Sequence, residues 1–252
     1  MKSILITGGS GKVGFQLVKH FLKKRFTVIT SSTDKERFLD NKEKELSHYK
    51  LEALHVIEVD FNTENAKNII LEYLQLHNIV LTDIIHNARS LNFLKLEDDK
   101  TISNENFSGE FYMDVVFPYQ LSMAVKNQMF HKLQNIIFIS SMYGVVAPTP
   151  ALYDDFENSS AIHYGVSKAA QIHLTKELAV RLAPEIRVNC VSFGGIKGRT
   201  DEHFENRYKK LTPQQRMLEE EDVIGPVDFL ISKSSTNMTG HNLKVDGGWT
   251  IW

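Results

Sequence analysis

Short β-branched apolar runs alternate along this chain with longer amphipathic stretches, and this order constrains the fold more than any other feature. The runs with the length and composition of strands are 3–7, 27–31, 55–60, 83–87, 135–140, 186–192 and 242–246. Helical spacing marks intervening stretches such as 13–24, 111–128, 164–182 and 220–232. Strands that alternate with helices through short connections predict right-handed crossovers. We therefore expect an α/β fold with a doubly wound parallel sheet.

The length of the chain limits its domain organisation. With 252 residues, of which 42% are hydrophobic, it can bury a full core, and α/β folds of this size commonly form one domain. Two long stretches, 143–163 and 194–218, look irregular. A strong helix or strand follows each, so we expect them to be substrate loops within one domain spanning 1–252.

The charge balance argues for a small molecule as the partner. The 29 basic and 31 acidic residues give a net charge of −2, which supplies no global field for nucleic acid or an anionic membrane. No segment approaches the roughly 20 apolar residues of a membrane helix, and the N-terminal stretch lacks a signal-peptide core. Cys190 is the only cysteine, which excludes an intrachain disulfide and a cysteine-rich metal site. We expect no metal and a cytoplasmic location.

A glycine-rich turn follows the first predicted strand and opens the first helix, in the order Thr7-Gly8-Gly9-Ser10-Gly11-Lys12-Val13-Gly14. Backbone N–H groups and the positive end of the helix dipole would there face a pyrophosphate. Gly8 would permit the tight turn, Gly11 a close approach of the backbone to the ligand, and Gly14 close packing of helix on sheet. An ordinary strain-relieving turn is the alternative. The first interpretation predicts Rossmann-type dinucleotide binding by Gly8, Ser10, Gly11, Lys12, Val13 and Gly14.

Tyr164 and Lys168 stand four residues apart at the start of a predicted helix, so their side chains share one face. A free tyrosine, with a pKa of about 10, is a poor acid or base at neutral pH. A cation about 4 Å away would stabilise the phenolate by roughly 4 kcal/mol at an effective dielectric near 20. The pair therefore fits proton transfer by Tyr164 assisted by Lys168, and a surface Tyr–Lys pair is the alternative.

Six segments of the chain occur in the order seen in short-chain dehydrogenases, and the sequence resembles that family over nearly its whole length. They are the glycine turn, His86-Asn87-Ala88, and the segments 139–144, 164–168, 187–192 and 245–249. The resemblance implies a Rossmann fold, a nicotinamide cofactor and oxidoreductase activity. It also implies that Ser141 hydrogen-bonds the substrate oxygen, that Tyr164 gives or takes the proton, and that Lys168 tunes Tyr164 while binding the nicotinamide ribose.

Further cofactor contacts are implied by the same resemblance. Asn87 and Ala88 resemble the strand-end residues that support the cofactor, and Ile196 resembles the loop residue whose backbone meets the carboxamide. Asp60, with Phe61, looks like the family's adenine contact, and a plain strand-capping Asp60 is the alternative.

The chain also departs from the family pattern. The glycines fall as TGxxGxxG, a spacing more typical of the longer, epimerase-like branch, and Arg89 stands where a glycine usually follows Asn-Ala. For Arg89 we expect solvent exposure. Asp114 stands where the family has a relay asparagine, and a surface helix Asp is the alternative. The stretches 140–156, 209–218 and 245–252 resemble dehydrogenases of bacterial surface-carbohydrate and flagellin-glycan synthesis, including nonulosonate sugars.

The residues after the second predicted strand bear on the choice of cofactor. An acidic residue there would hold the ribose 2′-hydroxyl of NAD, but the chain has Thr30-Ser31-Ser32-Thr33. We expect Ser31 and Ser32 to line the adenine ribose site, with Lys12 and Arg37 near a 2′-phosphate. This predicts NADP, with NAD as the alternative.

The sequence is compatible with three functions. The first is interconversion of a carbonyl and a secondary alcohol, on a sugar or amino-sugar derivative. The second is an epimerase or dehydratase that returns its hydride to the substrate, and the third is a dinucleotide-sensing protein on the same fold. Trp249, Ile251 and Trp252 look exposed near the C-terminus, and the family resemblance implies a homotetramer or homodimer.

Overall fold

One parallel sheet organises the structure, a computed structural model that describes residues 2–129, 131–198 and 200–252. Its seven strands lie in the order β3-β2-β1-β4-β5-β6-β7. Their bounds are β1 Ser3–Ile6, β2 Thr27–Ser32, β3 Leu54–Glu58, β4 Asp83–His86, β5 Asn135–Ser141, β6 Arg187–Phe193 and β7 Asn242–Val245. The doubly wound parallel fold expected from the sequence is confirmed.

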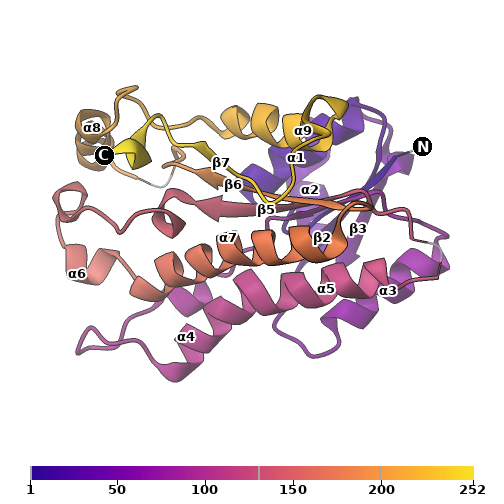
Figure 1. Ribbon diagram of the computed structural model, residues 1–252, viewed down its shortest axis with the longest axis horizontal. Coiled ribbons are helices and arrows are strands. Elements are labelled where there is room, and N and C mark those ends of the chain that lie inside the picture. Colours follow the sequence, from indigo (N-terminus) through magenta and orange to yellow (C-terminus); the bar gives the residue numbers. More distant parts are fainter. Residues whose placement is uncertain (1, 130, 199) are drawn as a thin grey trace.

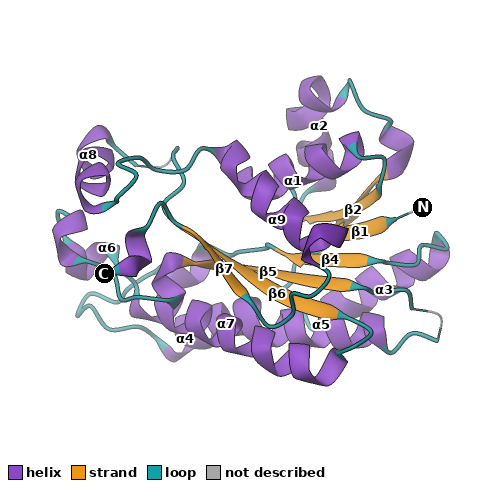
Figure 2. Ribbon diagram, turned by 45° about the horizontal axis from the view of Figure 1, so that its top comes forward, coloured by secondary structure: helices purple, strands orange, loops and turns teal. Residues whose placement is uncertain are grey.

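Helices cover both faces of the sheet (Figure 2). One layer contains α1 Lys12–Lys23, α2 Lys35–Leu46 and α9 Ile224–Ile231. The other contains α3 Ala66–Leu76, α4 Asn104–Phe111, α5 Phe117–Lys126 and α7 Ile162–Leu182. Two further helices, α6 Phe156–Ser159 and α8 Glu202–Leu211, lie beyond the carboxyl ends of the strands (Figure 1).

The central strand β1 shows how the sequence produces these layers. Leu5 packs in the core on the side of α3, α5 and α7, whereas Ile4 and Ile6 pack in the core on the side of α1 and α9. Successive residues of a strand face opposite sides of the sheet, and helices cover both sides here. All three side chains are therefore fully buried. An apolar run without polar alternation is therefore what this position requires.

The order of the strands places the site. The chain runs outward from β1 through β2 to β3, then returns to β4 on the other side of β1. The connections after β1 and β4 therefore diverge and leave a crevice at the carboxyl edge, where open α/β sheets bind ligands. This edge lies on the left in Figure 1, with α6, α8 and the C-terminus.

The structure refines several expectations about individual elements. The stretch 194–218 is not irregular throughout, because α8 occupies ten of its residues, and α6 and the first two residues of α7 lie within 143–163. The predicted helix 111–128 is a π-helical turn over Tyr112–Val116 followed by α5. The predicted helix 220–232 begins as a 3-10 turn, Glu220–Val223, before α9.

The C-terminal segment also differs from expectation. Trp249 is buried, with its ring stacked on Tyr208 at a centroid distance of 4.6 Å and an interplanar angle of 23°. Ile251 and Trp252 are exposed, as expected. Within the described ranges no helix combines the length and apolar character needed to cross a membrane.

Candidate active site

The glycines of the turn have two roles: two of them allow close packing, and one leaves the backbone open to a ligand. Gly8 has a φ of +69°, and a Cβ there would lie 2.8 Å from the Ala88 Cα. A Cβ at Gly14 would lie 2.3 Å from the Gly8 carbonyl oxygen and 2.7 Å from the Asn87 Nδ2. At Gly11, the N-cap of α1, it would meet only the Gly8 oxygen at 3.5 Å. Gly8 and Gly14 thus let strand, turn and helix pack together, whereas Gly11 keeps the backbone open toward the crevice.

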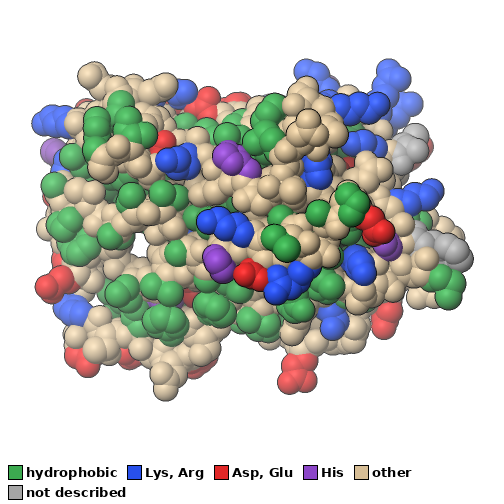
Figure 3. Space-filling model, in the orientation of Figure 1, with side chains coloured by type: hydrophobic (Ala, Val, Ile, Leu, Met, Phe, Trp, Pro, Cys, Tyr) green, Lys and Arg blue, Asp and Glu red, His purple; other side chains and the backbone are tan. Residues whose placement is uncertain are grey.

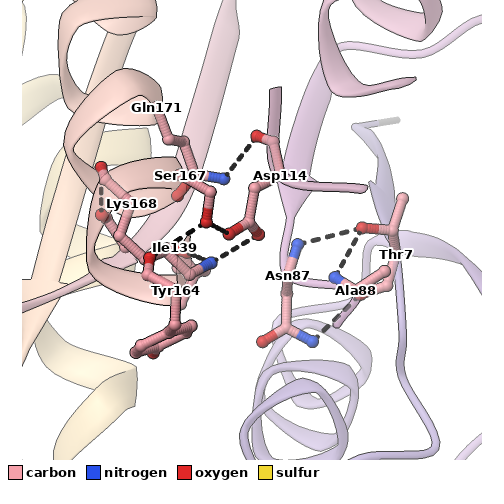
Figure 4. A network of polar contacts seen from close by, with 10 residues as sticks. Thr7, Asn87, Ala88, Asp114, Ile139, Tyr164, Ser167, Lys168 and Gln171 are labelled. Atoms are coloured by element: carbon pink, nitrogen blue, oxygen red, sulfur yellow. Dashed lines mark hydrogen bonds and ion pairs between the residues drawn. The ribbon is translucent and has the colours of Figure 1, made fainter. Parts of the chain in front are cut away.

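The ends of β1 and β4 are held together by Thr7 and Asn87 (Figure 4). The Asn87 Nδ2 donates to the carbonyl oxygens of Thr7 at 3.0 Å and Gly8 at 3.1 Å. The Thr7 Oγ1 accepts from the backbone N–H groups of Asn87 at 2.9 Å and Ala88 at 3.0 Å. Asn87 therefore fixes the shape of the glycine turn from the neighbouring strand.

A cavity of about 1260 Å³ extends from this turn along the carboxyl edge. The space-filling view is hollowed at the same end of the molecule, on the left, with hydrophobic side chains around the hollow (Figure 3). Most of the predicted site residues line the cavity, namely Gly8, Ser10, Gly11, Lys12, Val13, Gly14, Asn87, Ser141, Tyr164, Lys168 and Ile196. The turn predicted to bind a dinucleotide and the Tyr164–Lys168 pair therefore open into one space.

Other predicted site residues lie outside the cavity lining, and these include Ala88, Ser31 and Ser32. The Ser31 Oγ accepts from the Gly8 N–H at 2.9 Å, so Ser31 supports the turn from β2. The ring of Phe61 is buried and stacked on Phe117 at a centroid distance of 4.4 Å, so any contact of this segment with adenine would come from Asp60 or the backbone. The Asp60 Oδ1 accepts a hydrogen bond from the Asn62 N–H at 2.9 Å. This is the contact expected if Asp60 only caps the end of the strand.

Asp114 is buried against the start of α7 and binds two of its side chains (Figure 4). Its Oδ1 accepts from the Lys168 Nζ at 2.7 Å, and its Oδ2 accepts from the Ser167 Oγ at 2.7 Å. Burial alone would lower the pKa of Lys168, but the Asp114 carboxylate and Tyr164 outweigh burial and raise it. The alternative of a surface Asp114 is excluded, and Lys168 stays an ammonium ion in a buried position.

The backbone around Asp114 is shaped for this contact. Asp114 lies in the π-helical turn, and its carbonyl oxygen accepts from the Gln171 Nε2 at 3.0 Å. The Lys168 Nζ also donates to the Ile139 carbonyl oxygen of β5 at 3.2 Å. Lys168 is thus held from two sides by fixed acceptors, a precondition for a constant electrostatic effect on Tyr164.

The phenol ring of Tyr164 lies close to two cations. The Lys168 Nζ is 5.8 Å from the ring centroid, and the Arg89 guanidinium carbon is 4.7 Å from it. Arg89 is exposed, as expected, but it also lines the cavity and lies over the Tyr164 ring. The sequence interpretation did not predict this contact. The signal that could have indicated it is the long cationic side chain at a position where the family usually has glycine.

The far end of the cavity is aromatic and tied to α8. The hydroxyl groups of Tyr143 and Tyr153 lie 2.6 Å apart, and burial raises the pKa of Tyr143. Arg207 of α8 donates to both carboxylate oxygens of Asp154, at 2.6 and 2.9 Å, and to the Leu152 carbonyl oxygen. Bidentate geometry makes this a well-oriented ion pair, so α8 and the segment after β5 form one wall of the cavity.

Lys12 lines the cavity, but its ammonium group is already paired. Its Nζ is 3.1 Å from the Glu220 carboxylate and donates to the Gly198 carbonyl oxygen at 3.2 Å. Gln16 donates to the same carboxylate at 3.2 Å. Lys12 therefore bridges the glycine turn to the 194–218 segment, and Arg37, exposed on α2, remains as the cation expected near a 2′-phosphate.

Comparison with known proteins identifies the family. The family model described as enoyl-(acyl carrier protein) reductase matches residues 10–250. A short-chain dehydrogenase from Leptospira borgpetersenii, solved with bound NAD⁺, is 30% identical with a TM-score of 0.82, over 99% of this chain and 92% of that one. The chain belongs to the short-chain dehydrogenase/reductase family. The expected enzyme class, an NAD(P)-dependent oxidoreductase, is confirmed.

Two curated relatives of this dehydrogenase span nearly its whole length. Post-translational flagellin modification protein A of Campylobacter coli is 27% identical over 257 residues, covering 99% of this chain and 98% of the relative. Dihydromonapterin reductase of an Enterobacter strain is 28% identical over 253 residues, covering 98% and 96%. The first confirms the resemblance to the flagellin-glycan branch.

Among the described residues, no group of three or more His, Cys, Asp or Glu side chains could hold a metal ion.

Proposed function

We propose that this dehydrogenase interconverts a carbonyl and a secondary alcohol by Tyr, Lys and Ser catalysis, with a sugar or amino-sugar derivative as its substrate. The observation that carries the proposal is the buried Lys168 ammonium, held by Asp114 beside the Tyr164 ring in a cavity that reaches the glycine turn. A protein that only sensed a dinucleotide would have no use for a buried, oriented cation at a phenol.

In the direction of alcohol oxidation, Tyr164 accepts the hydroxyl proton of the substrate as a general base. The Lys168 ammonium stabilises the phenolate, and Asp114 with the Ile139 carbonyl oxygen keeps Lys168 in place. Ser141 accepts a hydrogen bond from the Tyr143 N–H at 3.2 Å and so retains its own O–H to donate to the substrate oxygen. In carbonyl reduction the same groups act in reverse, and Tyr164 donates the proton.

The cavity fits a nicotinamide dinucleotide. The N-terminus of α1 and the open backbone at Gly11 would hold its pyrophosphate, Asn87 and Lys168 would support the nicotinamide ribose, and the Ile196 backbone would meet the carboxamide. When bound, this group would accept or supply the hydride. We infer that NADP is preferred over NAD, because β2 ends in serines and α2 presents the exposed Arg37.

The setting of the enzyme follows from the same proposal. Similarity to a flagellin modification protein supports a substrate from surface-carbohydrate synthesis. The lone, buried Cys190 suits the reducing cytoplasm, where we place the enzyme. We further infer a homodimer or homotetramer.

The decisive experiment removes one oxygen atom. Tyr164→Phe should lose most turnover, by roughly a thousandfold or more, while dinucleotide binding stays within about threefold of wild type. Turnover is followed by NAD(P)H absorbance with a panel of keto sugars and their alcohols, and binding by fluorescence titration. Tyr119→Phe, an exposed tyrosine of α5, is the matched control and should behave as wild type. Normal turnover in Tyr164→Phe would refute the assignment, and product formed without net absorbance change would point to an epimerase or dehydratase.

A further inference from the structure

Glu110, in the last turn of α4, is a buried acid for which the mechanism above has no role. Its residue is 1% exposed, and neither carboxyl oxygen has a hydrogen-bond partner among the described residues. Buried carboxylates in proteins are ordinarily paired with a cation or with several N–H donors. An acid left without either partner needs an explanation.

Its position connects Glu110 to the Asp114–Lys168 pair. Asp114 follows four residues later in the same helical run, and α4 packs against α7, which carries Lys168. Both Asp114 oxygens already accept hydrogen bonds, one from Lys168 and one from Ser167. The charge of the Lys168 ammonium is therefore already balanced by the Asp114 carboxylate. A charged Glu110 would therefore be a second negative charge for a single buried cation.

The other titratable groups around Glu110 do not neutralise it. Arg89, from the connection after β4, interacts with Glu110 only through space and is itself exposed to solvent. His163, at the start of α7, has its Nε2 2.6 Å from the Phe93 carbonyl oxygen. Burial first, and then the like charge of Asp114, raise the pKa of Glu110 to about 7, against the opposing effects of Lys168 and Arg89. Glu110 is therefore a neutral acid below that pH.

We propose that Glu110 is a positioning residue for proton transfer, whose ionisation adds a second negative charge beside Asp114 and Lys168 and so opposes formation of the Tyr164 phenolate. The inference rests on the proposed function of Tyr164. Neutral Glu110 leaves Lys168 free to stabilise the phenolate, whereas ionised Glu110 competes for that cation. As the pH rises, Glu110 ionises and opposes the phenolate. The rate of alcohol oxidation therefore increases less steeply with pH than it would with Tyr164 and Lys168 alone.

The kinetic test replaces Glu110 by its neutral isostere. In Glu110→Gln the limb of the pH–rate profile for alcohol oxidation should move to lower pH by up to roughly one unit. Below the pKa of Glu110 the variant and wild type should have the same kcat/KM, because the acid is then neutral in both. Glu105→Gln, an exposed glutamate in the first turn of α4, is the control and should leave the profile unchanged. Superimposable profiles for wild type and Glu110→Gln would overturn the inference.

A second readout does not depend on activity. Infrared difference spectra between wild type and Glu110→Gln should show a protonated carboxylic acid band at pH 6 that disappears at pH 8. Because the folded-state pKa of Glu110 is raised from 4.5 to about 7, wild type should lose thermal stability relative to Glu110→Gln as pH rises between these values. Absence of the band at pH 6 would show an ionised Glu110 and refute the inference.

The two proposals fail in different ways. Normal turnover in Tyr164→Phe would refute the proposed function, and with it the role of Glu110 in proton transfer, whatever the infrared band shows. An enzyme that needs Tyr164 but is indifferent to Glu110→Gln would refute only the inference about Glu110.

Discussion

Asp114 gives the site one negative charge in direct contact with the cation that assists Tyr164. Its carboxylate favours the Lys168 ammonium but opposes the phenolate, so replacing it with a neutral acceptor should help the phenolate to form. We predict that Asp114→Asn remains active and moves the tyrosine limb of the pH–rate profile for alcohol oxidation to lower pH by about one unit. The measurement is kcat/KM against pH with a fixed alcohol substrate.

The opposite charge beside the same ring supplies the control. Arg89 lies 4.7 Å from the Tyr164 centroid, so Arg89→Gln removes a positive charge and should move the limb to higher pH. Because Arg89 is exposed, solvent screens its charge and its effect should be smaller than that of Asp114→Asn. Shifts of the same sign in both variants would contradict an electrostatic origin.

At the level of elements, the glycine turn separates stability from binding. Gly14→Ala should destabilise the protein by about 1–3 kcal/mol, because its Cβ would collide with the Gly8 carbonyl and displace Asn87. Gly11→Ala has room for its Cβ and should leave the apoprotein's stability unchanged, but weaken dinucleotide binding by roughly tenfold. Urea denaturation and fluorescence titration measure the two effects. A Gly11→Ala variant with lost stability and intact binding would show that the two roles are interchanged.

The end of β2 decides between the two forms of the cofactor. Since no acid follows β2 before Asp34, whose carboxylate caps α2 by accepting from the Arg37 N–H at 2.9 Å, we predict that NADPH binds more tightly than NADH. Arg37→Ser should reduce this preference by roughly tenfold, with NADH binding unchanged. Lys35→Ser on the same helix turn is the control. Equal or tighter binding of NADH in wild type would refute the prediction.

Elements with an unbroken run of buried apolar residues could be predicted from the sequence. Elements without such a run could not. The strand runs agree with the structure to within one or two residues because strands covered on both faces carry runs of apolar residues, such as Ser3–Ile6 and Asn135–Ser141. By contrast, α8 was missed because half of its residues are charged, and Tyr208 is its only buried residue.

Within the site, the order of the motifs predicted Tyr164, Lys168 and Asp114, but motifs do not show how rings pack, and the stacking of Phe61 on Phe117 was not foreseen. The contact of Arg207 with Asp154 joins residues 53 positions apart, which no local pattern reveals.

At the scale of the whole molecule, apolar side chains remain exposed on the layer that contains α7. Ile162, Val166 and Val180 of α7 are 68%, 44% and 81% exposed, with Phe107 of α4 also exposed. We predict that a second copy of the chain covers α4 and α7 within this layer, so that light scattering at micromolar concentration gives two or four times 28.8 kDa. Val180→Glu should lower this mass, because it buries a charge in the interface.

The control for this assembly is Leu76→Glu, a change at an equally exposed leucine at the end of α3, which should keep the wild-type mass. A monomeric wild type would refute the assembly. A mass unaffected by Val180→Glu would place the interface on another surface.

The stacking of Trp249 on Tyr208 bears on how the enzyme should be handled. Tyr208 accepts from the Gly195 N–H at 2.8 Å, next to Ile196, and only three residues follow Trp249. A purification tag fused after Trp252 would begin three residues beyond a ring that packs against Tyr208 of the cavity wall. The start of β1 lies at the opposite edge of the sheet (Figure 1). An N-terminal tag is therefore the better choice, and weak activity in a C-terminally tagged protein would say little about the native enzyme.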